Sequence, residues 1–530
     1  MHAFLPADHA FLKKHSAKIA GVLSCFDRII FRGYLPISHP RGVLGWLHQL
    51  GVAYTDFKKF APELAGRLLQ HAKDTAHAAG RPYRYLPTRE PKEELARQIA
   101  ARDGITEGLV CVFSCLETCR TFRLRYGAGR PQLTSDLRRC TVLYYFWMDA
   151  EFGLMHVKLH TWLPVTCQVY VNGHSYLERK LQEHGIAYHA VDNTFVWIAD
   201  VAAAQRLADG LLRQAWPRRL TMWAKRVNPL LADVLRGAEG KAFEYYWVTD
   251  QAEFATDVMF RDRQGLAGLY PALLEHATLA FGSEDVLRFL GRKPSPNFKG
   301  EVQTERKLLP IPEHHGRVEG VRVKHVMKTN RLKMYDKAGQ VLRIETVIND
   351  PTEFRVRRWK NKHGRRHLAW QPLRKGVAWL WRYAEVGMAA NRRYLEALAA
   401  VDDPSPARKL LDQVCRPARW QKRRRRALQP LSPHDQALFL AVLRGEHHLH
   451  GMRNRDLAKQ LYGDVPRDPV KRRRQGARVT RMIQLLRAHG ILAKVPRSRR
   501  YRITPHGERL LSSAIYVRYK HLPKELSDAA

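Results

Sequence analysis

Residues 468–490 place apolar and basic side chains on opposite sides of one predicted helix. Val479, Ile483 and Leu486 recur at the spacing of a buried helical stripe. The opposite side carries Arg474, Arg478, Arg481 and Gln484. Guanidinium groups bind phosphates and guanine edges, and a glutamine amide pairs with adenine, so this side has the chemistry of a helix that lies in a major groove. The pattern predicts a nucleic-acid-binding helix.

The residues on either side of this helix predict the rest of a small domain. Ser432 and Pro433 have the chemistry of a helix start, and a second helix fits residues 454–462. After the basic helix, alternating residues predict two short strands joined by a basic loop, which would form a wing. The wing arginines are Arg497, Arg499 and Arg500. This order of elements predicts a winged helix-turn-helix over residues 432–524.

The run Tyr501-Arg502-Ile503-Thr504-Pro505-His506-Gly507 is similar to the wing-to-helix junction of MarR-like and other winged-helix DNA-binding domains. The resemblance covers about a fifth of the chain. It implies a domain that binds duplex DNA. A winged helix that contacts protein is the alternative, and the arginines on both helix and wing disfavour it.

The chain is strongly basic, which indicates a polyanion as partner. Its 530 residues carry 91 Lys and Arg against 50 Asp and Glu, a formal net charge of +41 at pH 7. Residues 401–530 hold 30 of these cations and 11 of the acids, so the remaining excess requires a second basic surface in the body. A field of this size attracts nucleic acid and steers its encounter with the protein. We expect DNA as the favoured partner, with RNA as the alternative.

The sequence predicts a soluble, cytoplasmic, nucleoid-associated protein without a membrane partner. No apolar run approaches the roughly 18–20 residues that a membrane-spanning helix requires. Asp8 and Lys13 stand where a secretory signal would be apolar. Seven cysteines in a chain of this length suit a reducing compartment, and we expect Cys111, Cys115 and Cys119 to be buried thiols, not metal ligands.

The fold class predicted for the remainder is α/β (α+β), a multidomain body that precedes the winged helix. Amphipathic helices are predicted at 44–50, 62–79 and 93–101. The predicted segments are an N-terminal α/β region at 1–128, an α/β core at 129–240 with the order strand-strand-strand-helix-strand, a helical section at 241–300, a basic β-meander with a long helix at 301–415, and a basic linker at 416–431.

The meander places a tyrosine and carboxylates on neighbouring strands. With a two-residue turn at Ala338 and Gly339, Tyr335 would lie on one face, and Asp336 and Glu345 on the other. The runs Lys333-Met334-Tyr335-Asp336-Lys337 and Leu342-Arg343-Ile344-Glu345 resemble strands of the rolling-circle replication initiators of phages and plasmids. That resemblance implies that Tyr335 attacks a DNA phosphodiester, while Glu345 and Asp336 hold Mg²⁺ or Mn²⁺.

Members of that family also carry a His-hydrophobic-His metal pair, and this chain departs from the pattern. The nearest candidates are His156 and His160, which share a strand face but stand four residues apart. Solvent-facing or hydrogen-bonded histidines are the alternative.

Basic residues of the meander and of the hairpin after it predict a second nucleic-acid surface. Their chemistry suits phosphate contacts, and Trp359 among them suits base stacking. A solvated charged face is the alternative. The residues are Lys324, Arg357, Arg358, Lys360, Arg365 and Arg366.

A different nuclease arrangement comes from the strand order around Asp149. Three strands, a helix and a fourth strand, with Asp149 after the first strand and Asp192 after the fourth, resemble the RNase H-like nuclease and transposase core. That resemblance implies two metals bound by carboxylates. The third carboxylate could come from a predicted helix at 251–260, where Glu253 and Asp257 stand four residues apart on one face. Aspartate in ordinary turns is the alternative.

The runs 256–261, 319–325 and 391–395 also resemble a group of uncharacterised bacterial proteins, which implies no activity. Two functional classes therefore stay open. The first is a nucleic-acid-processing protein of mobile-element type, a replication initiator or transposase-like nickase whose winged helix directs a basic body. The second is a non-catalytic transcription regulator or RNA-associated protein.

Overall fold

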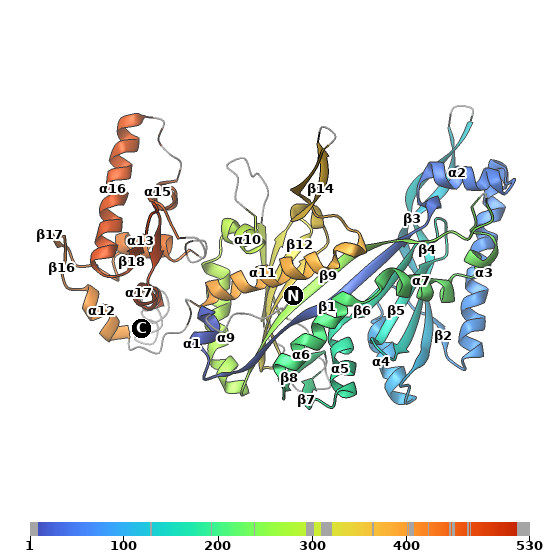
Figure 1. Cartoon of the computed structure of the whole chain (residues 1–530), viewed down its shortest axis with the longest axis horizontal. Helices are drawn as coiled ribbons and strands as arrows, with labels where there is room; N and C mark the ends of the chain where they lie inside the picture. Colours follow the sequence, from blue (N-terminus) through green and yellow to red (C-terminus); the bar gives the residue numbers. More distant parts are fainter. Residues whose placement is uncertain are drawn as a thin grey trace, which may run out of the picture. The chain divides into compact units, whose positions relative to one another are not determined.

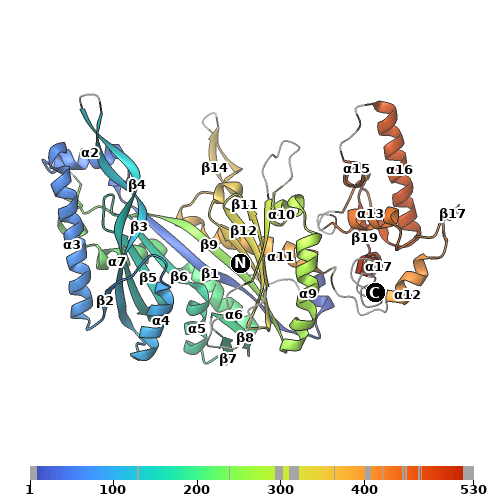
Figure 2. The same ribbon diagram turned by 180° about the vertical axis from the view of Figure 1, so that it is seen from behind.

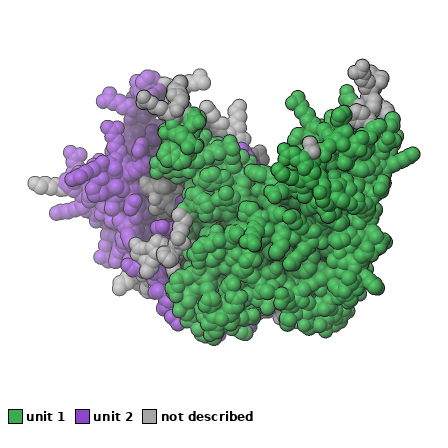
Figure 3. Space-filling model, turned by 45° about the vertical axis from the view of Figure 1, so that its right-hand side comes forward, with its two compact units in different colours: residues 1–4, 23–256, 347–388 green, residues 5–22, 257–346, 389–530 purple. Residues whose placement is uncertain are grey.

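The computed structural model divides into two compact units, each assembled from separate stretches of sequence (Figure 3). Unit 1 comprises Met1–Phe4, Leu23–Thr256 and Val347–Met388; unit 2 comprises Leu5–Val22, Asp257–Thr346 and Ala389–Ala530. The structure describes residues 9–127, 130–191, 193–237, 239–292, 302–308, 321–362, 365–399, 401, 407–421, 423–444, 447, 451–463, 466 and 468–516. The protein is mixed α+β with one large mixed sheet, which confirms the predicted class.

The large sheet contains two sets of five strands that follow the same order. The first set is β1 (Ile19–Tyr34), β3 (Gly108–Gly127), β4 (Arg130–Asp149), β5 (Gly153–His160) and β6 (Cys167–Asn172). The second set is β9 (Tyr246–Phe260), β10 (Val302–Leu308), β11 (Val321–Met327), β12 (Asn330–Lys337) and β13 (Val341–Ile348). Their orders are β1-β6-β5-β4-β3 and β9-β13-β12-β11-β10, so the first strand of each set lies beside its last strand. No corresponding repeat is visible in the amino-acid sequence.

Amphipathic helices pack on the strands of unit 1 (Figure 1). They are α2 (Pro40–Gln49), α3 (Phe57–Ala78), α4 (Lys92–Arg102), α5 (Gly173–Glu183) and α7 (Trp216–Val227). The first three confirm the helices predicted near the N-terminus. Unit 1 also contains α6 (Val201–Ala208), which packs on α5, and α8 (Leu230–Asp233). Helix α4 packs on β3 and β4, whereas α5 and α7 pack on β5. Trp216 and Trp223 of α7 enclose Phe152 at ring-centroid distances of 5.4 and 5.5 Å, which anchors this helix on the sheet.

Short elements complete unit 1. Strand β2 (Tyr83–Tyr85) pairs parallel with β3, and β7 (Tyr188–Val191) pairs with β8 (Thr194–Ile198). The predicted arginine-rich hairpin is confirmed as β14 (Arg355–Lys362) and β15 (Arg365–Pro372). Five 3₁₀ turns are η1 (Pro36–Ser38), η2 (Tyr54–Asp56), η3 (Asp209–Arg213), η4 (Pro351–Glu353) and η5 (Val377–Trp379).

Unit 2 has its own aromatic core. Its helices include α1 (Ala10–Lys14), α9 (Arg263–Leu279), α10 (Ser283–Phe289) and the second half of α11 (Leu380–Leu398). Tyr394 of α11 packs against Phe281 and Phe289 at 5.1 and 5.2 Å, and its hydroxyl lies 3.0 Å from Nε2 of His325. The helical section predicted at 241–300 is corrected at its start, because β9 runs to residue 260 before α9 begins.

The C-terminal part of unit 2 has the predicted order of elements (Figure 2). Among the described residues, the helices α13 (Pro433–Val442), α15 (Asn454–Tyr462) and α16 (Pro469–Ala488) precede the paired strands β18 (Leu492–Lys494) and β19 (Tyr501–Ile503) and the helix α17 (Pro505–Tyr516). The Ser432 hydroxyl accepts from the backbone N–H of Asp435, which confirms the predicted helix start. Val479, Ile483 and Leu486 are buried in one core with residues of α13, α15 and α17. The preceding segment contains α12 (Ala407–Val414), β16 (Ala418–Trp420) and β17 (Arg423–Arg425).

The cysteines and the helices were also predicted from the sequence. All seven cysteines are free thiols, and Cys111, Cys115 and Cys119 are buried along β3, as predicted. Among the residues that the structure describes, no helix combines the length and the apolar character needed to cross a membrane.

Candidate functional site

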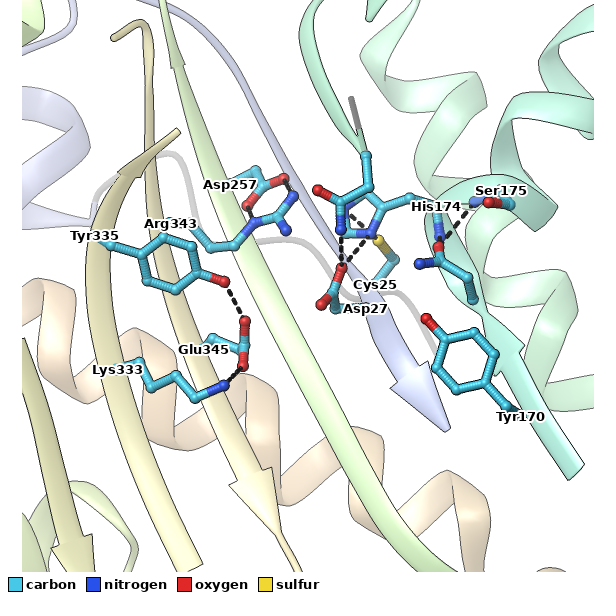
Figure 4. Close-up of polar contacts among 12 residues, drawn as sticks. Cys25, Asp27, Tyr170, His174, Ser175, Asp257, Lys333, Tyr335, Arg343 and Glu345 are labelled. Carbon is cyan, nitrogen blue, oxygen red and sulfur yellow. Dashed lines mark hydrogen bonds and ion pairs between the residues drawn. The ribbon is translucent and has the colours of Figure 1, made fainter. Parts of the chain in front are cut away.

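Tyr335, Glu345 and Lys333 form a compact polar group on strands β12 and β13 (Figure 4). Tyr335 donates its O–H to Oε2 of Glu345, and Nζ of Lys333 lies 2.5 Å from Oε1. Glu345 is fully buried, and Tyr335 is only 8% exposed. A buried carboxylate requires a counter-charge and hydrogen-bond donors, and these two side chains supply both. The group therefore holds a carboxylate next to a phenol that can give it a proton.

The hairpin that positions this group differs from the two-residue turn that the sequence predicted. Three residues, 338–340, separate β12 from β13, and Ala338 and Gly339 have φ of 54° and 67°. A change of one residue in register moves every side chain of a strand to the other face. For this reason Tyr335 shares a face with Glu345 instead of lying opposite to it.

Asp336 lies away from this group. Successive side chains of a strand point to opposite faces, so Asp336 faces the side opposite to Tyr335. There, burial and the negative charge of Asp336 raise the pKa of Tyr270 above its ordinary value. The structure therefore does not bring Asp336 and Glu345 together as the predicted pair of metal ligands.

Asp257 forms an ion pair with Arg343 within unit 2. It lies on strand β9, which corrects the helix predicted at 251–260. Its two oxygens accept from Nε and Nη2 of Arg343 at 2.6 and 2.7 Å (Figure 4). Both side chains are buried. Because the guanidinium engages both oxygens, Asp257 is held as a structural counter-ion and not as an open metal ligand.

The RNase H-like arrangement is not reproduced. The predicted order of three strands, a helix and a strand is present as β4, β5, β6, α5 and β7, but β7 pairs with β8 in a separate two-stranded sheet. Oδ1 of Asp149 accepts from the backbone N–H groups of Glu151 and Phe152 at 2.9 and 3.1 Å, which closes the turn after β4. Asp192 lies outside the described residues.

The two histidines of β5 serve packing. His156 stacks on Tyr170 with ring centroids 4.7 Å apart and an interplanar angle of 10°. His160 is buried beside Cys119. Of the predicted alternatives, a hydrogen-bonded histidine describes His160, whose side chain bonds to that of Cys119, whereas His156 is a ring packed on Tyr170.

Sequence reasoning missed a buried thiol-imidazole-carboxylate series in unit 1 (Figure 4). Nε2 of His174 lies 3.6 Å from Sγ of Cys25, and its Nδ1 lies 3.0 Å from Oδ1 of Asp27. A Cβ at Gly173 would approach the carbonyl oxygen of Phe26 to 2.0 Å, so glycine allows the start of α5 to reach β1. The three side chains are 2–7% exposed, so the Cys25 thiol is not an open nucleophile.

Glu253 adds a second carboxylate to this part of unit 1. Ligand oxygens of Asp27 and Glu253 lie within 4.8 Å of each other, and both side chains are buried. Carboxylate oxygens are the ligands that Mg²⁺ and Mn²⁺ prefer, so these two residues could hold one hard divalent cation. Burial lowers the pKa of the neighbouring Arg28, but Tyr170, Glu253 and Asp27 outweigh it and raise the pKa above its ordinary value.

Helix α16 presents the predicted basic side to solvent. Five arginines are exposed: Arg472, Arg473, Arg474, Arg478 and Arg481. Among the described residues, no carboxylate lies within 4.0 Å of Arg474, Arg478 or Arg481. Gln484 differs from the prediction, because its Oε1 accepts from Nη2 of Arg425 at 2.8 Å. Arg474, Arg478 and Arg481 are therefore available cations on the exposed side of α16, whereas the Gln484 amide is engaged by Arg425.

The predicted wing contributes fewer free cations than the sequence suggested. Arg497 and Arg499 are exposed in the loop between β18 and β19. Arg500 is half-buried and donates from Nη1 to the carbonyl oxygen of Gly451 at 3.3 Å, which ties the wing to the helical core.

The hairpin β14–β15 carries the second predicted surface. Arg357, Lys360 and Arg366 are exposed, and Arg358 is half-buried. The side chain of Arg365 lies outside the described residues. Lys324 of the meander is not available in the same way, because its Nζ lies 2.5 Å from Oε2 of Glu305 on the neighbouring strand.

Comparisons of the chain with protein-family models, with curated proteins and with solved structures found no match.

Proposed function

We propose that the protein binds nucleic acid and belongs to the mobile-element type, with a C-terminal winged helix that selects a duplex DNA site for a basic α+β body. The observation that carries this proposal is the row of exposed arginines on α16, opposite its buried stripe. Arg474, Arg478 and Arg481, which have no carboxylate within 4.0 Å among the described residues, are suited to phosphates, since phosphate contacts supply most of the affinity for DNA. The loop between β18 and β19 supplies two further exposed arginines, Arg497 and Arg499.

The variant Arg478→Ala/Arg481→Ala tests this proposal in the full-length protein. We expect about tenfold weaker binding to a labelled duplex of about three helical turns, because two phosphate contacts are lost. Fluorescence anisotropy at fixed salt measures the change. The matched control is Arg97→Ala/Arg102→Ala, whose guanidinium groups already face Glu93 at 3.2 Å and Asp103 at 2.7 Å. Equal affinity of the parent and the α16 variant would show that α16 does not contact DNA.

Metal-dependent DNA cleavage is a second candidate, favoured by the hydrogen bond from Tyr335 to Glu345. A phenol attacks a phosphodiester only after it loses its proton, and an adjacent carboxylate is a suitable acceptor. Mg²⁺ or Mn²⁺ would then neutralise the charge that develops on the phosphate. The burial of Tyr335 and Glu345 restricts access to this group, so binding is the better-supported function.

A nicking assay separates the two candidates. If the body cleaves DNA, Glu345→Gln should abolish nicking of supercoiled plasmid in Mg²⁺ or Mn²⁺ while DNA binding persists. Tyr335→Phe should abolish it only if the reaction passes through a covalent protein-DNA adduct, which denaturing gels detect. Absence of nicking by the parent in either metal would leave a non-catalytic transcription regulator or RNA-associated protein as the function of the body.

A further inference from the structure

The hairpin β14–β15 carries two exposed indole rings on the same face. The strands pair with Trp359 opposite Leu368 and Arg357 opposite Trp370. Side chains two residues apart on a strand share a face, so Trp370 lies on the side of Leu368 and therefore of Trp359. Trp359 is 66% exposed, and Trp370 is 56% exposed. Large aromatic rings left in solvent as a group mark a binding surface.

The same face combines these rings with polar groups that suit nucleotides. Arg357 lies beside Trp370 across the strands, and Asn361 pairs with Arg366 at the next position. Residues 355–372 contain seven Lys and Arg and no Asp or Glu, so the whole hairpin is complementary to a polyanion. Cζ of Arg382 lies 5.5 Å from the ring centre of Trp370, a contact that restrains this indole before any ligand binds.

We infer that this face is a stacking platform for the unpaired bases of single-stranded nucleic acid. Trp359 and Trp370 are diagonal neighbours across the two strands, and such positions are about 7–8 Å apart. This separation is about twice the 3.4 Å between stacked bases along one strand of a duplex. Rings on positions this far apart can each take one base of a strand whose bases have separated, whereas consecutive bases of a stacked duplex lie closer together.

This inference rests on the proposed function in part, because it identifies the hairpin as the contact of the body with nucleic acid. It assigns the two surfaces different substrates: α16 binds duplex, and the hairpin binds unpaired bases. A protein of mobile-element type requires both, since it must locate a duplex site and then hold a separated strand.

The variant Trp359→Ala/Trp370→Ala in the full-length protein tests the platform. We expect about 30-fold weaker binding of a labelled oligothymidylate, because each stacked base contributes at least about 1 kcal/mol. Trp359→Phe/Trp370→Phe should recover most of the affinity, since phenylalanine retains an aromatic face. Trp197→Ala is the matched control, because Trp197 is an exposed indole, 46% accessible, on strand β8.

Binding of duplex and oligothymidylate, together with a vesicle sedimentation assay, distinguishes the outcomes. The Trp double variant should bind duplex as tightly as the parent does. If the variant loses duplex binding together with oligothymidylate binding, the hairpin is part of the duplex site and the inference is overturned. Failure of the parent to bind oligothymidylate while it binds duplex would also overturn it and leave the proposed function intact. Failure of the parent to bind either would reject both. Sedimentation with phosphatidylserine vesicles that depends on the two indoles, without oligothymidylate binding, would identify the face as a membrane contact.

Discussion

Asp257→Ala should lower the free energy of unfolding of unit 2 by about 3–5 kcal/mol, because it leaves the buried guanidinium of Arg343 without its counter-ion. Both side chains are at most 1% exposed, and two hydrogen bonds join them. The carboxylate of Asp257 offsets much of the cost of burying the Arg343 guanidinium, because it accepts hydrogen bonds from both Nε and Nη2. Thermal and urea unfolding of the full-length variant measure the loss.

A paired replacement distinguishes charge from packing. Asp257→Leu/Arg343→Met removes both charges and retains most of the side-chain volume. Its free energy of unfolding should therefore be much closer to that of the parent than the value for Asp257→Ala is. Glu239→Ala is the surface control, because its contact with Lys241 at 2.9 Å joins two exposed side chains. A loss below about 1 kcal/mol in Asp257→Ala would show that the ion pair does not stabilise the unit.

The stability of unit 2 should fall in acid because of His325. Burial lowers the pKa of His325 to about 4 from its ordinary value near 6.5. Between these two pH values the imidazole of His325 binds a proton in the unfolded chain but stays neutral in the folded protein. This stability is therefore fully present above pH 6.5 and is lost as the pH falls toward 4, by about 3 kcal/mol in total.

His325→Gln isolates this contribution. Glutamine does not titrate but can still bond to the Thr304 and Tyr394 hydroxyls, which lie 2.9 and 3.0 Å from the imidazole nitrogens. We expect the difference in Tm between pH 7 and pH 4.5 to be smaller in the variant than in the parent. An equal pH dependence in both proteins would mean that His325 is not the group responsible.

Local sequence signals predicted the individual elements of the fold well. The helix start at Ser432, the buried stripe of α16 and the hairpin β14–β15 all depend on contacts within a few residues, which capping and periodicity encode directly. The prediction failed where the length of a turn, by a single residue, decides which face of the sheet a side chain lies on. The connection at 338–340 is one residue longer than predicted, and this reversed the face assigned to Tyr335.

The sequence did not indicate which distant strands pair with each other. Strand β1 pairs with β6, so that Ile30 lies opposite Tyr170, and the contact of Cys25 with His174 spans 149 residues. Neither local propensity nor spacing reveals which distant strands become neighbours. The strand β9 was predicted as a helix in part because Glu253 and Asp257 have helical spacing, although residues four apart also share a face of a strand.

The salt dependence of duplex binding is the most direct test of the central claim that the α16 arginines contact DNA phosphates. Each phosphate contact contributes about −0.9 to the slope of log K against log salt concentration. If its five exposed arginines each contact a phosphate, the full-length parent should give a slope of about −4 to −5. Arg478→Ala/Arg481→Ala should then make the slope shallower by about 2. A parent slope near zero, or the same slope in parent and variant, would contradict the claim.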